Sequence, residues 1–196
     1  MSTTSDTAPL FLQPAGLGHV HDMRRLDAQV YPNPWTAQLW RREVERSDTD
    51  ACYVVASIGG RHVGHAGLLV QVGDGHIVTV AVDPAEQRQG IATRLMLVLT
   101  RRAVRLGLDA LTLEVRLGNQ PAQDLYRRFG FGPAGVRPRY YADDGEDALI
   151  MWAHGVAEPD FVHRLDALAG ELVGRAIHHP VVDELLDAPA GIEVRS

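Results

Sequence analysis

The sequence contains no lysine: its 19 basic residues are all arginines, and with 25 acidic residues the formal net charge is −6. We attribute the absence of lysine to a bias in base composition. Proteins that bind nucleic acid rely on a basic surface, so the net negative charge argues against nucleic acid as a direct partner. The same charge is compatible with a basic partner protein.

Cysteine is almost absent, since Cys52 is the only one in the chain. A single thiol excludes an internal disulfide, and the lack of a cysteine cluster argues against a structural zinc site. Because Cys52 lies in the apolar run 51–58, we expect a buried thiol in the core. The pair His178-His179 does not predict a metal site, because adjacent residues on a helix do not share a face and no carboxylate at a suitable spacing completes a ligand set.

Long apolar runs are missing as well. No stretch approaches the length of a membrane-spanning helix, and residues 1–10 lack the basic start and apolar stretch of a signal peptide. We therefore expect a cytoplasmic protein with no membrane contact. The composition, 45% hydrophobic and 22% charged, is typical of a globular domain with a core of ordinary size.

What the sequence does contain is an alternation of strand and helix patterns. Apolar and β-branched runs bounded by glycine turns predict strands at 10–12, 52–58, 62–72, 76–82, 111–115, 135–140 and 148–152. Apolar residues at helical spacing predict helices at 19–30, after a Thr36 cap, and at 91–106, 121–129, 159–178 and 181–186. This order predicts a mixed α/β sheet, partly antiparallel and partly parallel. We expect a loose tail at 1–9, one domain at 10–154 and a helical C-terminal extension at 155–196.

The most informative segment is the junction at 80–92, where a strand ends and a helix begins directly after Gly90. Such a helix start presents backbone N–H groups without internal partners and the positive end of the helix dipole, which together suit a diphosphate. Gly90 would let the backbone approach a ligand closely, and Arg88 adds positive charge. An ordinary strand–turn–helix junction explains the same spacing, so the pattern alone leaves both interpretations open.

The run Gln87-Arg88-Gln89-Gly90-Ile91-Ala92 resembles the acyl-CoA loop of the GNAT superfamily of acetyltransferases, Arg/Gln-x-x-Gly-x-Gly/Ala. Further segments resemble the bacterial ribosomal-protein-alanine N-acetyltransferases. They are the Pro-Trp element at 31–35, then 113–116, Asn119, Leu125-Tyr126, Gly130-Phe131, Arg139-Tyr140-Tyr141 and 146–148. The similarity covers 10–154 and is strongest over 77–152. Asp27 departs from it, because glutamate is more usual there, which puts a role for that carboxylate in doubt.

The resemblance implies the GNAT fold: a mixed, mostly antiparallel sheet with a splayed parallel pair and flanking helices. It implies acetyl-CoA as co-substrate without a metal, and transfer of acetyl to the α-amino group of a protein N-terminus, with a ribosomal protein beginning with alanine as the best substrate. It also implies the residues that bind the co-substrate: Val80, Ala81, Val82, Gln87, Arg88, Gln89, Gly90, Ile91, Ala92, Thr93, Asn119 and Tyr126. The backbone near Val82 would assist the thioester oxygen.

The chemistry of this transfer asks for a base and an acid. Only a neutral amine attacks a thioester, and an α-amino group titrates near about 7.7–8.0, so a modest base suffices. The resemblance assigns the base to Glu114 and the acid that protonates the leaving thiolate to Tyr126. Without the resemblance, a surface residue on a half-exposed strand is the favoured interpretation of Glu114, and the alternative for Tyr126 is core packing beside Leu125 and Phe129.

The substrate groove is expected from aromatic side chains, which give rigid contact area with a polar tip. The residues concerned are Tyr31, Trp35, Tyr140 and Tyr141. Trp35 is equally a candidate core anchor. The acidic turn Asp143-Asp144-Gly145-Glu146-Asp147 suits an ammonium group, but a solvated turn has the same composition.

Two other functions fit the same resemblance. One is acetylation of a lysine side chain or a small-molecule amine on the same scaffold, since fold does not settle substrate. The other is a non-catalytic module that binds acyl-CoA without turnover, and the presence of both Glu114 and Tyr126 argues against it.

Overall fold

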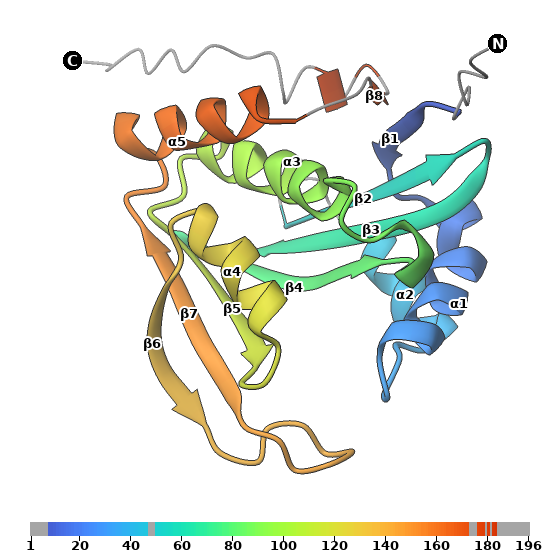
Figure 1. The fold of residues 1–196 in the computed structure, drawn as a ribbon, viewed down its shortest axis with the longest axis horizontal. Coiled ribbons are helices and arrows are strands. Elements are labelled where there is room, and N and C mark those ends of the chain that lie inside the picture. Colours follow the sequence, from blue (N-terminus) through green and yellow to red (C-terminus); the bar gives the residue numbers. More distant parts are fainter. Residues whose placement is uncertain (1–7, 47–49, 173–175, 179, 181, 184–196) are drawn as a thin grey trace, which may run out of the picture.

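The computed structural model describes residues 8–46, 50–172, 176–178, 180, 182 and 183. Eight strands form one sheet in the order β6-β7-β5-β4-β3-β2-β1-β8 (Figure 1). The strands are β1 (Leu10–Pro14), β2 (Ala51–Ile58), β3 (Arg61–Val70), β4 (Asp74–Val82), β5 (Ala110–Arg116), β6 (Gly132–Arg137), β7 (Ala148–His154) and β8 (Ala176–His178). The helices are α1 (Val20–Val30), α2 (Ala37–Val44), α3 (Ile91–Arg105), α4 (Gln120–Arg128) and α5 (Pro159–Gly170). The predicted mixed α/β sheet is confirmed.

The first half of the sheet is an antiparallel meander from β1 to β4. The turn between β2 and β3 is Gly59-Gly60, and both residues have positive φ, 56° and 78°. Such a pair matches the twist of a tight hairpin, which explains why the glycines stand at this point of the sequence. In β4, Val78 is an extra residue between the pairs Leu68–Ile77 and Gly67–Thr79, so the strand contains a β-bulge.

The second half of the sheet begins at a fork. Strands β4 and β5 are parallel and paired only from Asp74–Ala110 to His76–Thr112. Beyond His76 the two strands separate, and β5 pairs along its whole length with β7 on its other side. The splayed parallel pair that the resemblance implied is therefore present, and it opens the sheet between β4 and β5 (Figure 1).

Helices cover both faces of the first half. On one face α3 packs on β2, β3 and β4, and α5 packs on α3. On the other face α1 packs on β3 and β4, and α2 on β2. Alternate residues of β2 serve the two layers, because Val54 belongs to the main core and Tyr53 and Val55 to the second core under α1 and α2. Cys52 is only half-buried against the main core, less than predicted.

The predicted helix caps are present. The Leu39 amide donates to Thr36 Oγ1 at 3.1 Å, and the Ala122 amide donates to Asn119 Oδ1 at 3.2 Å. Each side chain satisfies a backbone group that the first helical turn cannot. Gly107 follows the end of α3 with a φ of 66°, the left-handed conformation in which helices commonly stop.

The predicted helix at 159–178 is wrong in its last part. Helix α5 ends at Gly170, and Ala176–His178 forms β8, which runs parallel to β1 with Leu10 opposite Ala176. The edge of β1 offers unpaired backbone groups, and pairing with them outweighs the weak helical spacing of this segment. His178 is therefore in a strand rather than on a helix, and Pro180 adopts helical conformation instead of ending a helix.

Two further differences concern segment ends. Strand β6 stops at Arg137, short of the predicted 140, because Pro138 cannot continue the ladder and Arg139 has a φ of 51°. Of the helix predicted at 181–186, the structure describes only Val182 and Asp183, and both are helical. The rest of that prediction lies outside the described residues. No helix in the described ranges combines the length and apolar character needed to cross a membrane.

Candidate active site

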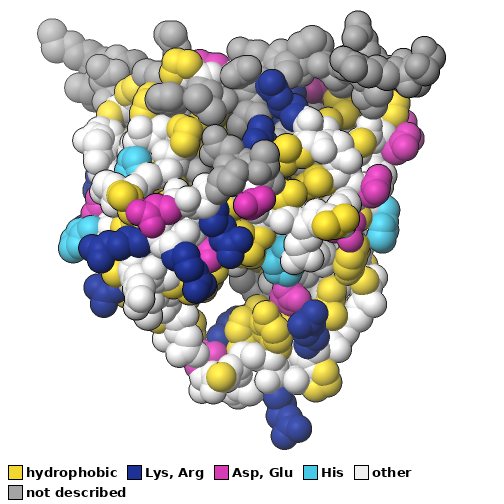
Figure 2. Space-filling model, turned by 180° about the vertical axis from the view of Figure 1, so that it is seen from behind, with side chains coloured by type: hydrophobic (Ala, Val, Ile, Leu, Met, Phe, Trp, Pro, Cys, Tyr) yellow, Lys and Arg dark blue, Asp and Glu magenta, His cyan; other side chains and the backbone are white. Residues whose placement is uncertain are grey.

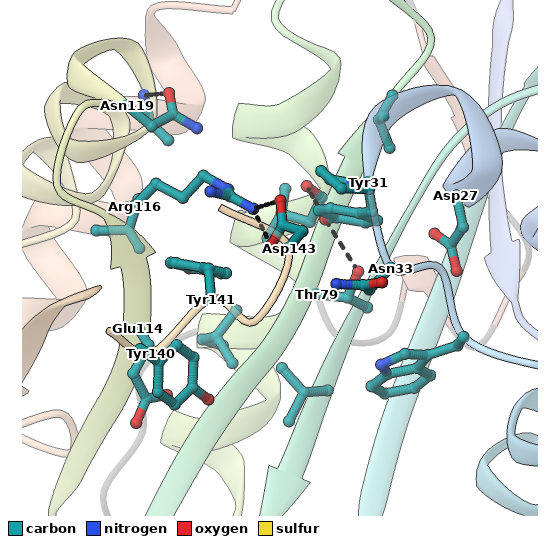
Figure 3. A pocket seen from close by; sticks show the side chains of 18 of the residues that line it. Asp27, Tyr31, Asn33, Thr79, Glu114, Arg116, Asn119, Tyr140, Tyr141 and Asp143 are labelled. Carbon is teal, nitrogen blue, oxygen red and sulfur yellow. Dashed lines mark hydrogen bonds and ion pairs between the residues drawn. The ribbon is translucent and has the colours of Figure 1, made fainter. Parts of the chain in front are cut away.

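A cavity of about 590 Å³ opens where β4 and β5 separate. The end of α1 and the loop to α2 form one wall, and β5, the start of α4 and the turn between β6 and β7 form the other (Figure 3). Seen from behind, the surface is hollowed in its lower half, with acidic and basic side chains around the hollow (Figure 2). The fork in the sheet therefore creates a concave site of the size that small-molecule ligands occupy.

About half of the predicted site residues meet in this cavity. Those that line it are Tyr31, Trp35, Val80, Glu114, Asn119, Tyr126, Tyr140 and Tyr141. Those that do not line it are Ala81, Val82 and the turn 87–93, which lie at the end of β4 and the start of α3. The predicted base and acid thus come from β5 and α4, whereas the predicted diphosphate turn follows β4, the strand on the other side of the fork.

Glu114 is not a free surface residue, because its side chain is only 9% exposed. Its Oε2 lies 3.0 Å from His76 Nε2, and its Oε1 lies 3.3 Å from a guanidinium nitrogen of Arg137. Neither contact was predicted from the sequence. No spacing rule connects them to Glu114, because His76 comes from β4 and Arg137 from β6.

Tyr126 faces the cavity from α4 and is 8% exposed. Burial raises the pKa of its phenol well above the ordinary value, and the nearby Tyr31 and Tyr141 hydroxyls add to the rise. Its ring also packs against Phe131, at 6.1 Å between centroids. The phenol therefore stays protonated at any physiological pH and is available as a hydrogen-bond or proton donor.

Tyr31 closes the opposite wall. Its hydroxyl donates to the Val80 carbonyl at 2.8 Å and lies 3.2 Å from Thr79 Oγ1 (Figure 3). Burial raises the pKa of Tyr31 to about 12. Trp35 lines the cavity and also packs on Trp40 of the second core, with ring centroids 4.6 Å apart, and its contact with a peptide stays a prediction.

The acidic turn between β6 and β7 is exposed at residues 142–145, Asp143 lines the cavity, and the carboxylates of the turn have a partner within the protein. The Arg116 guanidinium pairs with Asp143 at 2.7 Å and with Asp144 and Glu146 at 2.8 Å each. The ring of Tyr141 lies 4.0 Å from the same guanidinium, a cation–π contact. Arg116 therefore fixes the turn over the cavity (Figure 3).

Asp27 lines the cavity but is only 1% exposed. Its Oδ2 accepts from Trp40 Nε1 at 2.7 Å, and its Oδ1 lies 2.9 Å from His65 Nε2. The Nδ1 of His65 lies in turn 3.1 Å from His62 Nε2. This buried carboxylate ties α1 to α2 and β3, which gives it a structural task.

The turn at 87–92 has the geometry of an anion site. Gly90 is the N-cap of α3 with a φ of 77°. The amides of the first helical turn have no intrahelical partner, and the N-cap residue offers no side chain to bind them. Arg88 also has a positive φ, 65°, which is uncommon for a residue with a side chain. Arg61 braces the turn through Asp83 at 2.8 Å and through Glu86.

Metal coordination has no candidate in the described part of the chain, where no group of three or more His, Cys, Asp or Glu side chains could hold an ion. The cavity instead offers a largely buried carboxylate and a buried phenol, and β4 leads from it to the turn before the N-terminus of α3. Such a set can activate a nucleophile, protonate a leaving group and bind a phosphate.

Comparisons with known proteins agree with this chemistry. The sequence matches the model of the acetyltransferase (GNAT) family over residues 20–131. It is 34% identical over 136 residues to a "Putative [ribosomal protein bS18]-alanine N-acetyltransferase" of Bacillus subtilis, covering 69% of this chain and 87% of that protein. It is 36% identical over 155 residues to the "N-alpha-acetyltransferase RimI" of Mycobacterium tuberculosis, covering 76% and 94%.

A solved structure shows the same fold. The ribosomal-protein-S18-alanine N-acetyltransferase from Escherichia coli superposes with a TM-score of 0.67 at 26% identity. The match covers 74% of this chain and 94% of that one.

Proposed function

The chain belongs to the acetyltransferase (GNAT) family and is an acetyl-CoA-dependent N-acetyltransferase, and we propose that it acetylates the α-amino group of a protein N-terminus. The names of its relatives favour a ribosomal protein that begins with alanine. Such a substrate would place the reaction in the cytoplasm. The observation that carries the proposal is a buried carboxylate, Glu114, and a buried phenol, Tyr126, on the same cavity.

The residues present fit acetyl-CoA. The bare helix start at Gly90 and the left-handed φ of that residue suit a diphosphate, which residues 87–93 would hold. Beyond His76 the edge of β4 that faces β5 has no strand partner. Backbone groups of an unpaired edge can bond an extended ligand as another strand would. Val80 and Val82 alternate on β4 and would hold the pantetheine arm, with the Val82 amide near the thioester oxygen.

The cavity also suits the amine. Glu114 would take the proton of the attacking α-amine, directly or through one water, because its carboxylate is held inside the cavity. Tyr126 would donate to the departing thiolate, since its raised pKa keeps the phenol protonated. Tyr31, Trp35, Tyr140 and Tyr141 surround this space and would contact the first residues of the peptide.

The test uses alanine-starting peptides with free or blocked α-amines, incubated with acetyl-CoA and followed by mass spectrometry. Glu114→Gln and Tyr126→Phe each remove one transferable proton while keeping shape. We expect each to lower kcat by about 10²-fold or more, the usual range for general acid–base groups, with little change in CoA affinity. Glu45→Gln, at the exposed end of α2, is the matched control.

Two outcomes would contradict the proposal. Acetylation that survives a blocked α-amine would assign the enzyme to lysine side chains or other amines. Unchanged kcat in both variants would remove Glu114 and Tyr126 from the mechanism.

A further inference from the structure

His76 stands at the vertex of the fork. It is the last residue of β4 that pairs with β5, opposite Thr112, and Glu114 is two residues farther along β5. Alternate residues of a strand share a face, so Thr112 and Glu114 lie on the same side of β5, and the paired His76 lies on that side as well. The cavity opens beyond His76, and the side chains of His76 and Glu114 both line it.

The contact between the two side chains is close and sheltered. His76 Nε2 lies 3.0 Å from Glu114 Oε2, and the side chains are 24% and 9% exposed. The other carboxylate oxygen lies 3.3 Å from Arg137, whose side chain is 55% exposed. Each carboxylate oxygen thus has one partner, an imidazole at Oε2 and a guanidinium at Oε1, and of these two side-chain types only an imidazole can be either neutral or charged.

We infer that His76 is the positioning residue for Glu114: it fixes the carboxylate in the cavity and sets its basicity through its own charge. The inference rests on the proposed function, because it takes Glu114 as the base. A neutral imidazole that carries its proton on Nε2 can offer it to Oε2, 3.0 Å away, and leaves the carboxylate basic. A protonated imidazole adds a second cation beside Arg137, which stabilises the carboxylate and makes it a poorer proton acceptor.

The other titratable and charged groups around the pair are few. Arg137 faces Glu114 from β6, and Tyr140 and Tyr141 face it from the turn that follows. Across the cavity, Asp27 is already engaged by Trp40 and His65, and Tyr31 by Val80. Among the described residues that line the cavity, His76 is therefore the one histidine, the side-chain type suited to changing its charge near neutral pH.

A purely structural role predicts something different. If His76 only tied β4 to β5 at the fork, its replacement would lower stability and affect kcat at all pH values alike. Two substitutions separate the two roles. His76→Gln keeps an N–H donor at the place of Nε2 but cannot change charge, and His76→Leu keeps bulk and removes the donor.

The experiment compares kcat, KM and thermal midpoint of the full chain and both variants on the same alanine-starting peptide from pH 5.5 to 8.5. Dividing the wild-type kcat/KM by that of His76→Gln cancels the titration of the peptide amine. We expect this ratio to rise with pH by about tenfold over that range, and His76→Leu to lose about tenfold in kcat at pH 8 with KM for acetyl-CoA within about twofold. His163→Gln and His163→Leu, on the exposed side of α5, are the controls.

A ratio that is independent of pH, or equal kcat losses in His76→Gln and His76→Leu, would overturn the inference while leaving the proposed function in place. A wild-type protein that acetylates no free N-terminus would overturn the proposed function itself. Glu114→Gln is measured alongside. Unchanged activity in that variant would mean that Glu114 is not the base on which His76 is inferred to act.

Discussion

At the scale of single residues, the buried polar side chains are satisfied by partners from distant parts of the chain. Asp27 of α1 binds Trp40 of α2 and His65 of β3, and His65 contacts His62. All four are at most 8% exposed. An unpaired buried carboxylate would cost several kcal/mol, so this cluster fixes how α1 and α2 sit on the sheet and thereby where Tyr31 meets Val80.

The same cluster predicts how stability depends on pH. Burial, reinforced by the neighbouring His65, lowers the pKa of His62 from 6.5 to about 4. The unfolded chain therefore takes up this proton first, and folding stability should fall as the pH drops from 6.5 towards 4, by up to about 3 kcal/mol. Urea denaturation at pH 7.0, 5.5 and 4.5 measures the fall.

The loss of folding stability that His62 causes at acid pH should be absent from His62→Gln, because glutamine does not titrate. His21→Gln, on the exposed side of α1, should behave like the wild type. If His62→Gln lost stability with acid as steeply as the wild type, His62 would not be the group responsible.

At the scale of elements, two glycines flank α3 in the same left-handed conformation and differ in surroundings. Gly90 precedes the helix with a φ of 77°, and a Cβ there would come within 3.1 Å of Leu172. Gly107 follows the helix with a φ of 66°, and a Cβ there would meet nothing within 4 Å. A substitution at either glycine introduces the same backbone strain. Only a substitution at Gly90 also changes the shape of the turn before α3, so the two sites separate these effects.

Alanine substitutions should reveal this difference. Each should destabilise the protein by about 1–2 kcal/mol, the cost of the left-handed region for a residue with a Cβ. Only Gly90→Ala should weaken acetyl-CoA binding, by about tenfold, because it alters the turn proposed to hold the diphosphate. Isothermal titration with acetyl-CoA measures the affinity, and equal affinities for Gly90→Ala and Gly107→Ala would argue against that site.

At the scale of the whole molecule, the C-terminal segment is part of the main core. Phe161, Leu165 and Leu168 of α5 are buried in the same cluster as α3 and the sheet. Ion pairs from Arg101 to Asp166 at 2.9 Å and from Arg128 to Glu171 at 2.6 Å join α5 to α3 and α4. We therefore propose that α5 folds together with the acetyltransferase domain rather than as a separate unit.

This proposal predicts the effect of a single substitution. Leu165 is 1% exposed, and Leu165→Ala should lower the free energy of unfolding by about 2–4 kcal/mol, the usual cost of such a cavity. Urea titration followed by tryptophan fluorescence and by circular dichroism should give one common, shifted midpoint. Leu17→Ala, at 54% exposure, should change stability by less than about 0.5 kcal/mol. Two separate transitions in Leu165→Ala would mean that α5 is a separate unit.

The sequence by itself determined the local structure and the family. Periodicity predicted the strands and helices, Thr36 and Asn119 predicted the N-caps of α2 and α4, and Gly90 predicted the turn before α3. Each of these signals acts within a few residues of the chain. The run at 87–92 and the later segments indicated the GNAT fold. The Glu114 and Tyr126 roles remain proposals, but both side chains do lie on the same cavity.

Only the tertiary structure decided what surrounds those residues. Strand β8 replaced the end of a predicted helix, because the pairing partner, β1, lies at the other end of the sequence. His76 and Arg137 became partners of Glu114, and Arg116 bound the acidic turn, because the sheet and its turns bring together residues that lie 23 to 38 positions apart in the sequence. Such contacts follow from strand order and register, which local spacing does not encode.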